Sequence, residues 1–176
     1  MCWDSGLRPA AEKFRALLGP SAIIYTNSCP SSLRRVDKIP AVFDLLSADF
    51  YADYLPGSSG DDEVNQTREL YQGVLPKLAA HQRLMLVPGV FACANLLKSF
   101  PLEAQSSIVE RKLDHYFRWA LTDTRIAGLN PWHLLNRTKP QSGAKCDMAL
   151  GATAMPGVMR KLRAFGKAIV TQQKVS

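Results

Sequence analysis

Short apolar segments that alternate with amphipathic segments constrain the fold of this chain more than any other feature of its sequence. Four short runs, rich in β-branched residues or leucine, are typical of strands buried on both faces, and they cover residues 22–26, 41–51, 83–88 and 126–130. Apolar residues at helical spacing predict one helix before the first strand and one after each of the last three, at about residues 7–18, 63–80, 107–121 and 153–171. This alternation favours an α/β fold with a parallel sheet.

The composition is that of a folded protein. The 176 residues are 47% hydrophobic and 21% charged, which excludes the low-apolar, highly charged class of disordered chains. Because this length corresponds to about one domain, we expect a single α/β domain over residues 1–176. No run of 18 apolar residues predicts a membrane span, and the first six residues do not resemble a signal peptide, so the sequence predicts no localisation.

The positive charge is concentrated near the carboxyl terminus. The formal net charge is +7, and residues 124–176 hold nine bases against a single acid, Asp147. Bases at positions 160, 161, 163 and 167 fall on the last predicted helix. They favour a solvated helix face, and a surface that attracts an acidic partner is the alternative.

Neither the cysteines nor the motifs predict a metal or cofactor. The four cysteines form no C-x-x-C pair and have no zinc-ligand spacing with the histidines, so we expect them to be mostly reduced. Because nucleotide-phosphate loops and the aromatic–basic pattern of RNA-binding sheets are also absent from the sequence, we expect neither a nucleotide cofactor nor a nucleic-acid partner.

Candidate functional residues follow the predicted strands. In parallel α/β folds, sites form at the carboxyl ends of the strands. Side chains at these ends include amides, an acid and aromatic rings, a combination that suits the hydroxyls and apolar face of a sugar. The predicted saccharide-binding residues are Asn27, Ser28, Tyr51, Asn130, Trp132 and His133.

Asp49 is the candidate catalytic residue. Glycosidic hydrolysis needs two carboxyl groups about 5–10 Å apart. Asp44 and Asp49 lie five residues apart on one predicted strand and therefore point to opposite faces, so they are not expected to form that pair. Structural roles stay open for the same positions: a turn at Asn27, strand-end hydrogen bonding by Asp49, and packing by Trp132 and His133.

Three segments resemble (β/α)8 glycoside hydrolases and their uncharacterised relatives. The segment 44–51 is similar to a "DxxSxDxY" strand of such barrels, and the segments 84–91 and 126–132 are similar to the strands that follow it. The resemblance spans roughly residues 20–170 and implies the carboxyl-terminal half of a barrel. Many retaining enzymes of this kind end a strand in Asn-Glu, the Glu being the acid/base, whereas Ser28 follows Asn27 here, which implies weak or absent hydrolysis.

Three hypotheses remain at this stage. The first is a glycoside-hydrolase-like half barrel that binds saccharide and has residual hydrolytic activity or none. The second is a non-catalytic interaction module that oligomerises through open sheet edges or binds an acidic partner through its basic end. The third is a small doubly wound enzyme with another chemistry. The sequence predicts neither the substrate nor the oligomeric state, nor whether the chain is part of a longer one.

Overall fold

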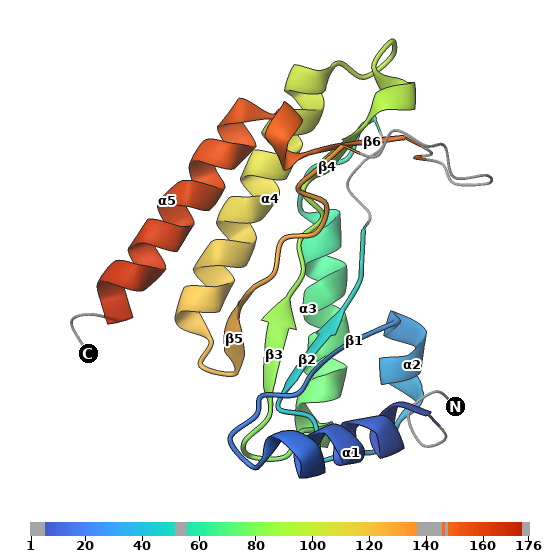
Figure 1. The fold of residues 1–176 in the computed structure, drawn as a ribbon. Helices are drawn as coiled ribbons and strands as arrows, with labels where there is room; N and C mark the ends of the chain where they lie inside the picture. The colour runs from blue at the N-terminus through green and yellow to red at the C-terminus, as the bar shows by residue number, and fades with distance from the viewer. Residues whose placement is uncertain (1–5, 52–55, 137–145, 147, 174–176) are drawn as a thin grey trace. The chain divides into compact units, whose positions relative to one another are not determined.

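A computed structural model describes residues 6–51, 56–136, 146 and 148–173 (Figure 1). In chain order, its helices (α), short 3-10 helices (η) and strands (β) are α1 (Arg8–Leu18), β1 (Tyr25–Ser28), α2 (Pro30–Arg35), β2 (Leu45–Ala48), α3 (Asp62–Val74), η2 (Leu75–Lys77), β3 (Arg83–Leu86), β4 (Phe91–Cys93), η3 (Ala94–Leu96), α4 (Leu102–Thr122), β5 (Ile126–Leu129), β6 (Ala149–Gly151), η4 (Ala152–Ala154) and α5 (Pro156–Gln173).

The chain forms two compact units, each assembled from three separate segments. Unit 1 comprises residues 1–50, 65–87 and 119–130, and unit 2 comprises residues 51–64, 88–118 and 131–176.

Unit 1 contains a four-stranded parallel sheet in the order β1-β2-β3-β5. The predicted α/β class and the parallel direction of the strands are therefore confirmed. The first strand begins at Tyr25, three residues later than expected, and β2 is limited to Leu45–Ala48.

The two faces of β1 differ in burial. Thr26 and Ser28 are buried, whereas Tyr25 and Asn27 are exposed, as expected when successive side chains of a strand alternate between faces. Asn27 and Ser28, which the sequence placed in one candidate site, thus lie on opposite faces of the sheet.

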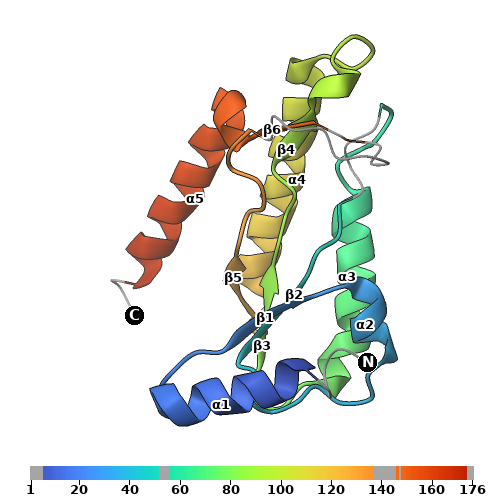
Figure 2. The ribbon, with the colours of Figure 1, turned by 45° about the vertical axis from the view of Figure 1, so that its right-hand side comes forward.

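α1 lies across the amino ends of the strands (Figures 1 and 2). The Arg15 guanidinium of α1 donates hydrogen bonds to the carbonyl oxygens of Ala22 and Val42 and to the Asp44 carboxylate, at 2.6 Å from Oδ2. That Oδ2 also accepts a hydrogen bond from the Ile24 amide at 2.7 Å. Asp44 therefore joins α1 to the segments entering β1 and β2, at the opposite end of the strands from the candidate site.

Replacing Asp44 by asparagine is expected to remove part of the stability above pH 4. Burial alone raises the pKa of Asp44, but the hydrogen bond from Ile24 and the Arg15 guanidinium outweigh it and hold the pKa below its ordinary value. A carboxyl group whose pKa is lower in the folded than in the unfolded state stabilises the fold at pH values above its unfolded-state pKa. This stabilisation is lost as the pH falls through the folded-state pKa. Urea unfolding at pH 7 and pH 3 should show a cost of about 1–3 kcal/mol at pH 7 that shrinks at pH 3. An equal cost at both pH values would contradict this assignment.

Two helix predictions need correction. The sequence analysis predicted no helix between the first two strands, whereas α2 begins at Pro30, because proline is favoured in the first turn of a helix. The start expected at about residue 107 is also wrong: α4 begins at Leu102, and the Ser107 hydroxyl donates to the Glu103 carbonyl inside the helix, at 2.9 Å.

Unit 2 contains a two-stranded antiparallel sheet, β4–β6, that the sequence analysis did not predict. A disulfide joins Cys93, the fully buried last residue of β4, to Cys146, which lies three residues before β6. The expectation that the cysteines are mostly reduced is wrong for these two, because spacing in the sequence does not reveal which thiols the fold brings together. Cys29 is a free, exposed thiol.

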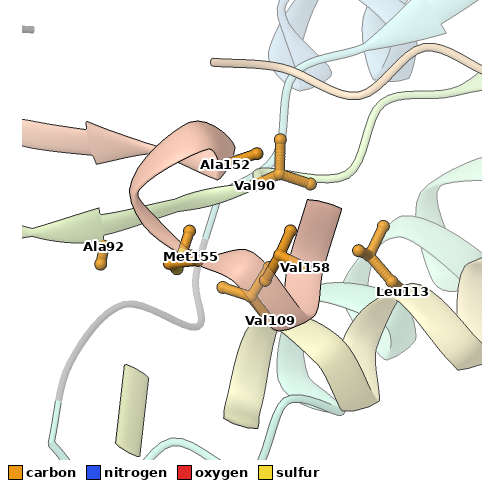
Figure 3. Packing of buried hydrophobic residues seen from close by; sticks show 7 residues of the cluster. All are labelled: Val90, Ala92, Val109, Leu113, Ala152, Met155 and Val158. Carbon is orange, nitrogen blue, oxygen red and sulfur yellow. The ribbon is translucent and has the colours of Figure 1, made fainter. Parts of the chain in front are cut away.

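The core of unit 2 lies between the β4–β6 region and the helices α4 and α5. Val109 and Leu113 of α4 pack with Met155 and Val158 at the start of α5 (Figure 3). Val90, Ala92 and Ala152 complete this cluster, and all seven side chains are at most 2% exposed.

Candidate functional site

A hydrogen-bonded set of four side chains lies toward the carboxyl end of the sheet in unit 1, and one of them, Tyr25, reaches it from the first residue of β1. The Ser47 hydroxyl donates to Asn27 Oδ1 at 2.5 Å and lies 2.6 Å from the Tyr25 hydroxyl, which in turn accepts from Asn130 Nδ2 at 3.4 Å. Because the single proton of Ser47 goes to Asn27, the Tyr25 hydroxyl donates to Ser47. We call Tyr25, Asn27, Ser47 and Asn130 the polar cluster.

The strand register explains how the polar cluster forms. Tyr25 and Asn27 project from the same face of β1, two residues apart, and Asn27 is directly opposite Ser47 of β2. Asn130 follows β5 and is fixed by a backbone hydrogen bond to the Leu86 carbonyl of β3, at 2.8 Å. Asn27 and Asn130 were predicted site residues. Tyr25 and Ser47 were not, although counting two residues back from Asn27 would have found Tyr25.

The polar cluster combines a buried centre with an accessible rim. Ser47 is fully buried, whereas Tyr25 is 40% exposed and the two asparagines are exposed. Asn27 uses its carbonyl oxygen inside the set and Asn130 uses its amide nitrogen, so Asn27 N–H groups and the Asn130 carbonyl can serve a ligand. The polar cluster thus leaves one oriented donor and one oriented acceptor for a ligand.

The two other predicted residues of unit 1 have different environments. Ser28 is buried on the face opposite Asn27. Asp49 directly follows β2 and is half-buried, near the Tyr71 hydroxyl. Burial is the main cause that raises the pKa of Tyr71, and the charge of Asp49 raises it further. The Tyr71 hydroxyl donates to the Met85 carbonyl at 2.8 Å and accepts from the Ala48 amide, so it ties α3 to the ends of β2 and β3.

Unit 2 holds the three predicted aromatic residues in one group with Phe91. The Tyr51 and Trp132 rings are stacked, with centroids 6.4 Å apart and planes at 15°. Phe91 meets the rings of Tyr51 and His133 edge-on, both with centroids 5.8 Å away. A Cβ atom at Gly89 would lie 2.8 Å from the Tyr51 ring, so the absence of a side chain there lets Tyr51 take this position.

Trp132 is held firmly while half of it stays exposed. Its amide donates to the Pro88 carbonyl and its carbonyl accepts from the Val90 amide, both at 3.0 Å, and its exposed fraction is 50%. His133 next to it has a φ of 76°, a left-handed conformation that its carbonyl supports by accepting from Ala152 at 3.2 Å. An open hollow lies over residues 131–136. A half-exposed indole ring on a backbone held by hydrogen bonds is the kind of surface on which a sugar ring can stack.

Comparisons with known proteins add no assignment. No family model matches the chain, and no curated protein matches it significantly. Among the described residues, no group of three or more His, Cys, Asp or Glu side chains could hold a metal ion, and no helix is long and apolar enough to cross a membrane.

Proposed function

We propose that this chain is a glycoside-hydrolase-like half barrel that binds saccharide at the polar cluster. The observation that carries the proposal is the hydrogen-bonded set of Tyr25, Asn27, Ser47 and Asn130 at the carboxyl ends of parallel strands. This is the end of a parallel sheet at which α/β proteins bind ligands.

The chemistry of the cluster suits a sugar hydroxyl pair. Vicinal hydroxyls of a sugar both donate and accept hydrogen bonds, and the two asparagines offer a donor and an acceptor whose orientations are fixed by Ser47 and Tyr25. Fixed polar groups lose little conformational entropy on binding, which favours recognition of a polar ligand. Within unit 2, the exposed Trp132 ring is a second surface that suits the same class of ligand.

Strand order supports the half-barrel part of the proposal. The four strands are parallel and adjacent in chain order, and helices α2, α3 and α4 connect them. Eight such strand–helix units make a complete (β/α)8 barrel, so four correspond to half of one.

In this proposal, saccharide binding is the main function and hydrolysis is residual or absent. Asp49 is the carboxylate at the carboxyl end of β2, and we assign any residual hydrolysis to it. Ser28 stands where the resemblance implies an acid/base Glu, and it is buried on the opposite face from Asn27. A serine hydroxyl does not supply a proton at neutral pH as a carboxylic acid does.

A saccharide panel tests the proposal. Ligand-observed NMR with neutral mono- and oligosaccharides should find at least one binder, and Asn27→Ala and Asn130→Ala should each weaken it about tenfold, as expected for one lost hydrogen bond of about 1.4 kcal/mol. Asn65→Ala, an exposed asparagine on α3, is the matched control and should leave the affinity unchanged. A panel without binders, or equal effects of all three substitutions, would refute the proposal.

A separate assay addresses hydrolysis. With aryl glycosides of the sugar that binds, any turnover should be abolished by Asp49→Asn while binding persists. Turnover that survives this substitution would remove Asp49 from the catalytic role.

A further inference from the structure

The helix α1 carries apolar side chains that the rest of the chain leaves exposed. Phe14, Leu17 and Leu18 are 58%, 71% and 66% exposed, and Ile23, just before β1, is 72% exposed. We call these four residues the apolar patch. In contrast, Ala11 is the buried residue of α1, and Arg15 is the side chain that anchors the helix to the segments before β1 and β2. α1 is thus fixed through a polar contact and presents its large apolar side chains to solvent.

From this arrangement we infer that a second copy of this chain covers the apolar patch. A twofold axis would place the patch of one copy on the same patch of the other, which is the commonest arrangement of homodimers. β1 is a terminal strand of the sheet and follows Ile23 of the patch closely in the chain, so an open strand edge begins near this contact.

The area of the patch supplies most of such a contact, so surface next to the patch must contribute the rest. From the exposed fractions of its four residues, the patch offers roughly 400–500 Å² of exposed surface per copy. The smallest specific interfaces bury about 500 Å² per partner. Phenylalanine and leucine are also costly to leave in water, at about 25 cal/mol for each Å² of apolar surface.

Charge around the patch favours self-association over an acidic partner. Of the three bases of α1, Arg8 is paired with Glu12 at 2.8 Å and Arg15 with Asp44 at 2.6 Å. Two of the three positive charges are therefore neutralised locally. Two copies of the patch can approach with little repulsion, and an anionic surface would gain little from binding here.

Sedimentation velocity between about 1 and 100 µM tests the inference. The wild-type chain should sediment as a dimer in the upper part of this range. Leu17→Glu places a charge in the contact, keeps a good helix former and should raise the dimer Kd at least about 30-fold. Leu135→Glu, at a leucine of 73% exposure outside the patch, is the matched control and should leave the dimer intact.

Each alternative outcome overturns the inference. A wild-type chain that is monomeric over the whole range shows that the patch has another occupant. Larger assemblies, a dimer that persists in Leu17→Glu, or equal loss in Leu135→Glu would place the contact elsewhere. The inference is separate from the proposed function: Leu17→Glu should keep its saccharide affinity and, at concentrations below the wild-type dimer Kd, its thermal midpoint, because the patch lies at the amino ends of the strands and the polar cluster toward their carboxyl ends.

Discussion

Replacing Lys112 by methionine is expected to destabilise the protein by about 3–5 kcal/mol. Lys112 Nζ lies 2.8 Å from Glu63 Oε2, and both side chains are at most 3% exposed. Glu63 Oε1 also accepts from the Gly89 amide at 3.1 Å and from the Tyr116 hydroxyl at 3.4 Å. Without the ammonium group, these neutral donors would still contact the Glu63 carboxylate, but its buried charge would be uncompensated. Denaturant unfolding followed by circular dichroism measures the loss.

The double variant Glu63→Gln with Lys112→Met is the control for this prediction. It removes both charges, so it should be clearly more stable than Lys112→Met alone, because the penalty comes from the unpaired charge rather than from the lost attraction. A single variant that costs less than about 1 kcal/mol would show that the ion pair does not hold unit 2 together as described.

Loss of the Cys93–Cys146 disulfide is expected to cost about 4 kcal/mol. The bond closes a loop with a sequence separation of 53 residues, and a cross-link of that size restricts the unfolded chain by this order of free energy. It also fixes the end of β4, whose last residue is Cys93. The Cys93→Ala, Cys146→Ala double variant should therefore unfold at a lower temperature than the oxidised wild-type chain.

Reduction provides the internal control. Dithiothreitol should lower the wild-type midpoint to that of the double variant and leave the variant unchanged. Thiol titration of the denatured chain should find two fewer thiols before reduction than after it. The same thiol count in both conditions would mean that the two cysteines are not bonded, and an unchanged midpoint on reduction would contradict the stabilising role.

Local patterns in the sequence predicted the sheet but not the small elements. The four apolar runs predicted the positions of β1, β2, β3 and β5 to within a few residues, but burial on both faces, the reason for that prediction, is wrong for β1, which is exposed on one face. β4 and β6 have only three residues each and are separated by the 55 residues 94–148, so no local period marks them. The disulfide was missed for the same reason: the proximity of Cys93 and Cys146 is a product of the fold.

The candidate site was predictable in part. The rule that sites form at the carboxyl ends of parallel strands correctly predicted that Asn27 and Asn130 lie at one end of the same sheet. The pairing of Asn27 with Ser47 depends on the register between two strands, which the sequence does not reveal, and it brings in a serine that seemed unremarkable. The alternation of β1 also separated Ser28 from Asn27, since neighbouring residues of a strand face opposite sides.

The most direct measurement of the central claim is a saccharide titration followed through the side-chain amide signals of Asn27 and Asn130. Our account predicts that both signals shift with one saturating Kd, and that Tyr25→Phe, which removes the hydroxyl between Ser47 and Asn130, weakens that Kd for both. If every saccharide that binds leaves these two amides unshifted, or shifts them with different affinities, the polar cluster is not a saccharide site.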